Sequence, residues 1–228
     1  TICIERAAEI LAEDKPIYLM YSGGLDSTCM LIAFHHILKQ KGDYSQLIIA
    51  TSSDSQHENP DAWREIIRPY YKLVHICTMF SQVKLDSYRY VMGENADQIF
   101  GSDRVFVDSS LLYVPYSKDT LKEFLSSRIR ASALERFHTE FLSLADKCPL
   151  PIKWIRDFLW WVNFTCKWQS VAMRTLSFTN VFEKNSKVKF DQVKQFETFY
   201  NTIPFQQLSM SGKLDRWRRI LDCLFNCK

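Results

Sequence analysis

The fold of this 228-residue chain is decided by one stretch, Ile17-Tyr18-Leu19-Met20-Tyr21-Ser22-Gly23-Gly24-Leu25-Asp26-Ser27. Its first five residues follow Pro16 and end at Ser-Gly-Gly, which is the pattern of a buried parallel strand that stops at a tight turn. From Ser27 to Gln40, apolar side chains recur at helical spacing until the chain reaches Gly42. A buried strand that passes through two glycines into a helix predicts an α/β fold.

Strands and helices are expected to alternate on both sides of this stretch. Helices are expected over Ile2–Ala12 and Asp61–Tyr71, strands over Leu47–Thr51, Leu73–Cys77 and Tyr90–Met92, and a polar loop over Ser52–Pro60. Such alternation implies a parallel sheet with right-handed crossovers, flanked by helices in a Rossmann-like arrangement.

After about Arg104 the pattern becomes mainly helical. Helices are expected over Lys118–Ser127, Ile129–Ala145, Ile152–Leu176, Val188–Tyr200 and Leu214–Cys227. The change predicts two regions. An α/β domain that binds a nucleotide would occupy residues 1–104, and a mainly helical region on the substrate side would occupy residues 105–228 and pack on it.

Composition narrows the class of protein. The net charge of +3 is too small to argue for a nucleic-acid partner, although it does not exclude one. The seven cysteines are scattered without Cys-x-x-Cys spacing, which disfavours a zinc or redox site and favours free thiols in a reducing compartment. No signal peptide or membrane-spanning segment is visible, so we expect a cytoplasmic protein without a membrane partner.

The loop after the first strand has the features of an anion-binding loop. Gly23 and Gly24 allow the backbone to approach a ligand closely, and the N–H groups at a helix start converge on an anion. Ser22 and Ser27 offer hydroxyl donors, and a bridging Mg²⁺ would explain Asp26 beside a polyanion. The spacing is neither that of a Walker loop nor that of a G-x-G-x-x-G turn. An ordinary serine-glycine turn that caps a helix is the alternative interpretation.

A second motif, Gly93-Glu94-x-x-Asp97, follows the strand expected at Tyr90–Met92 and opens a short helix. Two carboxylates three residues apart lie on one helix face. Because ligands bind at the carboxyl edge of a parallel sheet, Asp97 is a candidate to complete a magnesium site with Asp26, and Glu94 is a candidate general base. Alone, such a pair would more often be acidic residues that favour the helix dipole.

Together the two motifs resemble the synthetase domain of asparagine synthetase and its relatives, the β-lactam synthetases and lasso-peptide cyclases. These enzymes belong to the PP-loop ATP pyrophosphatase superfamily. The family carries S-G-G-L-D-S and a later G-E-G-x-D-E-x-F-G segment, which stand here as Ser22–Ser27 and Gly93–Gly101. Phe196–Met210 looks like the segment around the family's P-F-L-D motif, and Gly212–Arg216 looks like its G-K-M-E-K segment.

The resemblance implies an ATP-dependent ligase that adenylates a small-molecule carboxylate, releases pyrophosphate and transfers the acyl group to ammonia or an amine. It implies that ATP and Mg²⁺ are the cofactors, with the pyrophosphate held by Ser22, Gly23, Gly24, Leu25, Asp26 and Ser27. The residues expected near the rest of the nucleotide are Tyr21, Ala50, Thr51, Ser52 and Gly93. Asp97 would bind the metal with Asp26, and Glu94 would accept the nucleophile's proton.

Three departures from the family pattern bear on the acceptor chemistry. The family's catalytic lysine falls on Arg216, which clamps anions but does not easily release a proton, and Lys213 is the alternative. Asn95 replaces a glycine, and Gln98 replaces an acidic residue. No glutaminase domain or leading cysteine nucleophile is present, so we expect the amine to be ammonia, an amine substrate, or the product of a separate glutaminase or substrate-carrying partner.

Two other functions stay open. One is base modification by a PP-loop enzyme, either nitrile formation on a deazaguanine or thiolation of a tRNA base. The scattered cysteines disfavour both reactions. The other is a catalytically degenerate nucleotide-binding module with a regulatory role, which the presence of Asp26, Glu94 and Asp97 disfavours.

Overall fold

The computed structural model describes residues 1–76, 88–101, 114–171, 173 and 196–211. The chain forms two compact units. The first contains Thr1–Ala96 and Ser170–Pro204, and the second contains Asp97–Gln169 and Phe205–Lys228. The sequence predicted a single boundary near residue 104 and did not predict that Ser170–Pro204 belong to the first unit.

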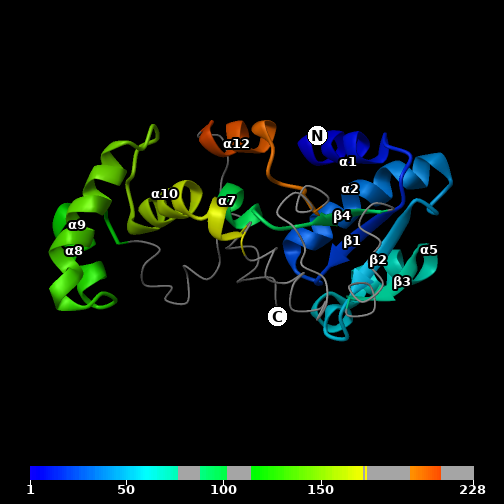
Figure 1. Cartoon of the computed structure of the whole chain (residues 1–228), viewed down its shortest axis with the longest axis horizontal. Coiled ribbons are helices and arrows are strands. Elements are labelled where there is room, and N and C mark those ends of the chain that lie inside the picture. Colours follow the sequence, from blue (N-terminus) through cyan, green and yellow to red (C-terminus); the bar gives the residue numbers. More distant parts are fainter. Residues whose placement is uncertain (77–87, 102–113, 172, 174–195, 212–228) are drawn as a thin grey trace. The chain divides into compact units, whose positions relative to one another are not determined.

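The first unit is built on a parallel sheet (Figure 1), in which the described residues contribute five strands in the order β3-β2-β1-β4-β5. The strands are β1 (Ile17–Tyr21), β2 (Leu47–Thr51), β3 (Lys72–His75), β4 (Arg89–Met92) and β5 (Phe196–Thr198). From β1 the order runs outward in one direction through β2 and in the other through β4. The predicted parallel α/β sheet flanked by helices is therefore confirmed, and its strand order reverses between β1 and β4.

The register brings the ends of the central strands to one edge. Tyr21 of β1 pairs with Thr51 of β2, and Met20 of β1 pairs with Met92 of β4. The segments that begin at Ser22 and Gly93 therefore leave neighbouring strands at the same level of the sheet. This edge, at the reversal of strand order, is where ligands bind in open α/β sheets.

Helices connect and cover these strands. Helix α1 (Ile2–Leu11) packs on α2 (Leu25–Lys41), which in turn packs on β1. Between β2 and β3 lie α3 (Ser55–Glu58), α4 (Pro60–Ala62), the π-helical turn η1 (Trp63–Ile67) and α5 (Arg68–Tyr70). The expected loop thus contains a helical turn. The helix expected over Asp61–Tyr71 is confirmed, since the residues from Pro60 to Tyr70 are all helical, with a π-helical turn before Pro69, which lacks the N–H of a regular helix.

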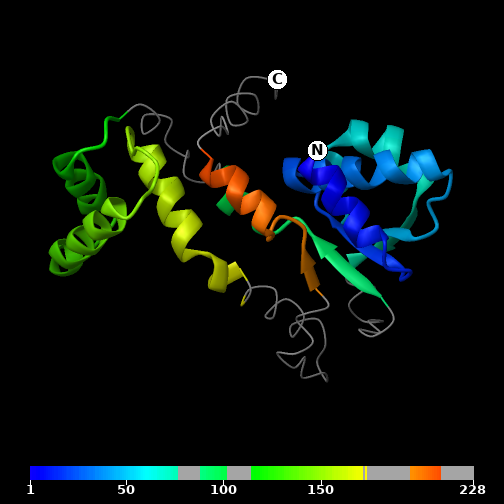
Figure 2. The ribbon, with the colours of Figure 1, turned by 90° about the horizontal axis from the view of Figure 1, so that it is seen from above.

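Strand β5 corrects a sequence prediction. The helix expected over Val188–Tyr200 is wrong at its end, where β5 pairs in parallel with β4, and Figure 2 shows the orange β5 arrow beside the green β4 arrow. The buried ring of Phe196 stacks on Tyr90 with centroids 5.0 Å apart. Packing against a distant strand overrides the local helical spacing. Residues 188–195 and the helix expected at Leu214–Cys227 lie outside the described residues.

An ion-pair network ties β5 to the rest of the first unit. One carboxylate oxygen of Glu197 pairs with Arg6 of α1, and the other pairs with Arg89 at the start of β4. The side chains are 20%, 10% and 15% exposed respectively, so the charges are largely shielded from water. Arg89 also donates to the carbonyl oxygen of Ile10 at 2.9 Å. The network therefore joins a helix and two strands.

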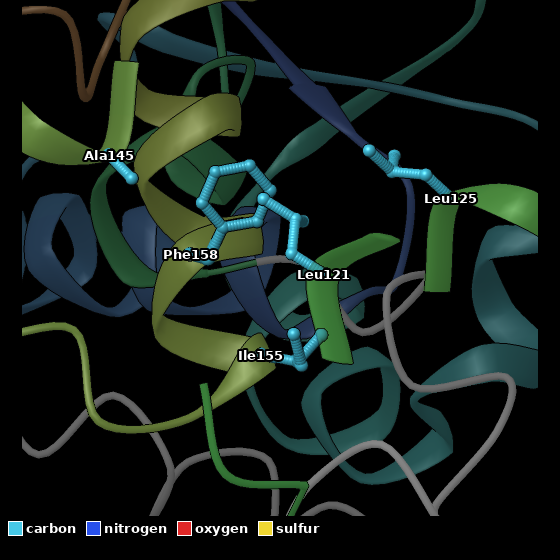
Figure 3. Close-up of a cluster of buried hydrophobic side chains, with 5 residues drawn as sticks. All are labelled: Leu121, Leu125, Ala145, Ile155 and Phe158. Atoms are coloured by element: carbon cyan, nitrogen blue, oxygen red, sulfur yellow. The ribbon is translucent and has the colours of Figure 1, made fainter. Parts of the chain in front are cut away.

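The second unit is helical. Its described helices include α7 (Ala96–Phe100) and α12 (Ile203–Met210), both of which begin in the first unit, and α8 (Lys118–Ser126), α9 (Ala131–Asp146) and α10 (Ile155–Cys166). The helices α8, α9 and α10 enclose a core shown in Figure 3, made of Leu121, Leu125, Ala145, Ile155 and Phe158. The helices expected over Lys118–Ser127 and Ile129–Ala145 are confirmed. Within the helix expected over Ile152–Leu176, α10 begins at Ile155 and ends at Cys166, and helical residues resume at 168–171 after a bend at Lys167. Within the described ranges, every helix is too short or too polar to cross a bilayer.

Candidate functional site

The two glycines of the first motif are required by the backbone between β1 and α2. Gly23 has a φ of +95°, which residues with a side chain rarely adopt. A Cβ placed on Gly23 would also lie only 2.5 Å from the carbonyl oxygen of Ser55. Gly24 is the N-cap of α2 and has an extended backbone. The loop is therefore a tight turn that delivers the chain directly to a helix start.

The two serines of the motif meet across this turn. The Oγ of Ser22 lies 3.1 Å from the Oγ of Ser27, and Gly24 donates its N–H to the Ser22 oxygen at 3.3 Å. Ser27 is buried and donates to the carbonyl oxygen of Gly24 at 2.9 Å, whereas Ser22 is exposed. Hydroxyl groups thus gather at the start of α2, where the helix dipole favours an anion.

The second motif meets the first at Gly93. A Cβ placed on Gly93 would lie 3.5 Å from the backbone nitrogen of Ser27 and 3.7 Å from the Cβ of Asp26. The end of β4 therefore packs on the first turn of α2. Tyr200, which follows β5 and is 1% exposed, donates its phenol to the carbonyl oxygen of Asp26 at 2.8 Å. Burial raises the pKa of Tyr200, which keeps the phenol protonated as a donor.

Glu94 and Asn95 form the turn from β4 into α7. Asn95 is 5% exposed and has a φ of +72°. Asparagine enters this left-handed region more readily than other residues that carry a side chain. The chain therefore makes a glycine-type turn without a glycine, and half-buried Glu94 stands directly after Gly93 at the edge of the sheet.

Asp97 belongs to the second unit. Asn163 of α10 donates to the carbonyl oxygen of Asp97 at 2.8 Å, and the Nζ of Lys167 lies 3.7 Å from its Oδ2. The side chains of Asp97 and Lys167 are about one third exposed, at 36% and 34%. Its expected partnership with Asp26 in a metal site stays a prediction. The candidates Lys213 and Arg216 lie outside the described residues.

The segment after β2 contributes residues that the motif search missed. Ser55 is 1% exposed, donates its hydroxyl to the carbonyl oxygen of Tyr21 at 3.0 Å, and accepts the N–H of Ser52 at 3.2 Å. It therefore joins the ends of β1 and β2 beneath the loop. The sequence predicted a polar loop here, whereas the structure makes Ser55 the first residue of α3, after the N-cap Asp54.

The residues expected near the nucleotide on β1 and β2 have mostly buried side chains. The hydroxyl of Tyr21 lies 3.3 Å from the Oγ1 of Thr28, which also accepts a hydrogen bond from Asn59 at 3.3 Å. Burial raises the pKa of Tyr21. Ala50 is fully buried in the core, and Thr51 donates its hydroxyl to the next carbonyl oxygen at 3.1 Å. These mostly buried side chains therefore pack beneath the Ser-Gly-Gly loop, at the ends of β1 and β2.

The metal site expected at Asp26 stays a prediction. Among the described residues no group of three His, Cys, Asp or Glu side chains could hold a metal ion. A cation at Asp26 would therefore need oxygens of a ligand, which is how Mg²⁺ commonly binds in proteins that act on phosphates. Comparison with known proteins gives no relative, since no family model, curated protein or solved structure matches this chain.

Proposed function

We propose that this chain is an ATP-dependent amide-forming ligase of the asparagine-synthetase type. The observation that carries the proposal is the meeting of the two motifs, since Gly93 lies against Ser27 and Asp26 beside the point where the strand order reverses. Ligands of open α/β sheets bind at such points. The positive φ of Asn95 adds support, because a glycine stands at this position in the family.

The groups at the loop fit a pyrophosphate moiety. Ser22 and Ser27 supply hydroxyls, and the N–H groups of the first turn of α2 supply further donors. Mg²⁺ held by Asp26, with Asp97 as the further predicted ligand, would neutralise charge on the phosphate oxygens. Donors of this kind favour the departing pyrophosphate, whose charge grows as the bond to the α-phosphate breaks.

In the proposed reaction, a carboxylate oxygen of the acyl substrate attacks the α-phosphorus of ATP, and the bond to the bridging oxygen of the β-phosphate breaks. Pyrophosphate leaves with that electron pair, and the loop stabilises it. The amine then attacks the acyl carbon, and AMP leaves. Glu94, next to Gly93, is the proposed acceptor of the amine proton.

ATP–pyrophosphate exchange with a panel of carboxylates tests this proposal. Exchange that depends on one carboxylate, and that is lost in Asp26→Ala, would support the ligase and name its acyl substrate. ATP binding without cleavage in the presence of every candidate would reject the ligase. That result would favour the regulatory nucleotide-binding module instead.

A further inference from the structure

One carboxylate lies over the Ser-Gly-Gly loop and has no part in the proposed reaction. It belongs to Glu58, the last residue of α3. The Cβ of Glu58 lies 2.7 Å from the position of a Cβ on Gly23, and its Oε1 lies 3.3 Å from the position of a Cβ on Gly24. The side chain therefore runs along both glycines, on the loop that would receive phosphate.

The carboxylate of Glu58 is exposed at the surface of the first unit. In the part of the chain that the structure describes, this exposed carboxylate forms no ion pair and accepts no hydrogen bond. Its negative charge adds to burial, the larger cause, in raising the pKa of Tyr21 at the base of the loop. Glu58 and Asp26 thus place two carboxylates at a loop whose backbone is arranged for an anion.

The backbone of α3 keeps Glu58 in this place. On one side, Ser55 is hydrogen-bonded to the carbonyl oxygen of Tyr21 at 3.0 Å. On the other side, Asn59 donates its side-chain amide to Thr28 in α2 at 3.3 Å. Because the residues that flank Glu58 are held to β1 and α2, the carboxylate stays close to the loop even if its outer torsion angles change.

We propose that Glu58 makes the binding of pyrophosphate at this loop conditional on a divalent cation. A metal-free polyanion would meet the like charge of Glu58, whereas a magnesium chelate carries less negative charge and presents a cation to the same carboxylate, which lowers the repulsion. The inference rests on the proposed function, because it needs a polyphosphate at the loop. Glu58 thereby discriminates between metal-free pyrophosphate and its magnesium chelate.

Calorimetric titration with inorganic pyrophosphate at low ionic strength, with excess Mg²⁺ or with EDTA, tests this role. The wild type should bind far more tightly with Mg²⁺. Glu58→Gln keeps the shape of the side chain, and it should bind metal-free pyrophosphate about tenfold more tightly, so that the magnesium enhancement shrinks. Asp14→Asn is the matched control, since it removes an exposed carboxylate just before β1, at the opposite edge of the sheet, and should behave as wild type.

Two outcomes would count against these proposals. An unchanged ratio of the two affinities in a folded Glu58→Gln variant overturns the role of Glu58 and leaves the proposed function standing. A wild type that binds pyrophosphate under neither condition overturns both. Thermal unfolding checks the fold, and Glu58→Ala serves as a second neutral variant with the same expectation.

Discussion

Replacing Gly23 with alanine should destabilise the first unit and damage the loop. The φ of +95° is strained for alanine, at a cost of about 1–2 kcal/mol. The new Cβ would also lie 2.5 Å from the carbonyl oxygen of Ser55 and 2.7 Å from the Cβ of Glu58. Ser55 cannot retreat freely, because it is buried and bonded to Tyr21, and overpacking of this kind costs about 1–3 kcal/mol.

Gly42 offers a matched control. It ends α2 with a φ of +70°, and no neighbouring atom lies within 4 Å of the position of its Cβ. Gly42→Ala therefore measures backbone strain alone, about 1–2 kcal/mol. Gly23→Ala combines strain with overlap, which gives about 2–5 kcal/mol. The difference between the two variants reports the close approach of α3 to the loop.

Urea unfolding followed by circular dichroism gives both free energies, with the denaturant dependence checked for equality. Both glycines belong to the first unit, so the same transition is compared. Titration with magnesium pyrophosphate should show weakened binding for Gly23→Ala and unchanged binding for Gly42→Ala. Equal destabilisation by the two substitutions, or normal binding by Gly23→Ala, would refute the reasoning.

Three further predictions concern other parts of the chain. Glu197→Gln leaves Arg6 and Arg89 without their shared carboxylate, so urea unfolding should show that the free energy of unfolding falls by about 2–3 kcal/mol. This is below the range for fully buried ion pairs, because the three side chains are partly exposed. A decrease under about 0.5 kcal/mol, the usual scale for surface substitutions, would contradict the prediction. Burial lowers the pKa of His35 from its ordinary 6.5, because the charged ring is disfavoured in the folded protein. The free energy of unfolding should therefore be unaffected by His35 above pH 6.5 and should decrease as the pH falls below 6.5. Urea unfolding at several pH values should show a smaller decrease for His35→Gln. Asp97→Asn should abolish carboxylate-dependent exchange, since Asp97 is a proposed metal ligand, and full activity would reject the metal assignment. Its unfolding free energy should change by no more than about 1 kcal/mol, because the ion pair with Lys167 is long, at 3.7 Å, and in partial contact with solvent.

The central strands could be predicted because their signals are local. Leu47–Thr51 and the run after Pro16 are each long enough for a buried strand, and the glycines that follow the first can serve only a turn. The same signals place both motifs at the ends of neighbouring strands, where Gly93 lies against the start of α2. Periodicity and turn chemistry act over a few residues, so a single sequence displays them.

The missed features depend on distant partners. The three residues of β5 carry no periodic signal, and they form a strand because Phe196 stacks on Tyr90 and Glu197 is paired with two arginines. The position of Glu58 against the loop depends equally on Ser55, which is held by a carbonyl group 34 residues earlier. Polar residues in a segment expected to be a loop gave no reason to place them at the site.

The pairing of β5 with β4 also constrains the order in which the chain can assemble. Arg89 and Glu197 are 108 residues apart, and most of the second unit lies between them in the sequence. During synthesis on the ribosome, β1, β2, β3 and β4 are complete long before the last strand exists, and closing so long a loop slows its docking. Until then, the outer side of β4 has backbone groups ready to pair with another chain. The three residues of β5 therefore cover an edge of β4 that stays open to other chains until they have been synthesised and have docked.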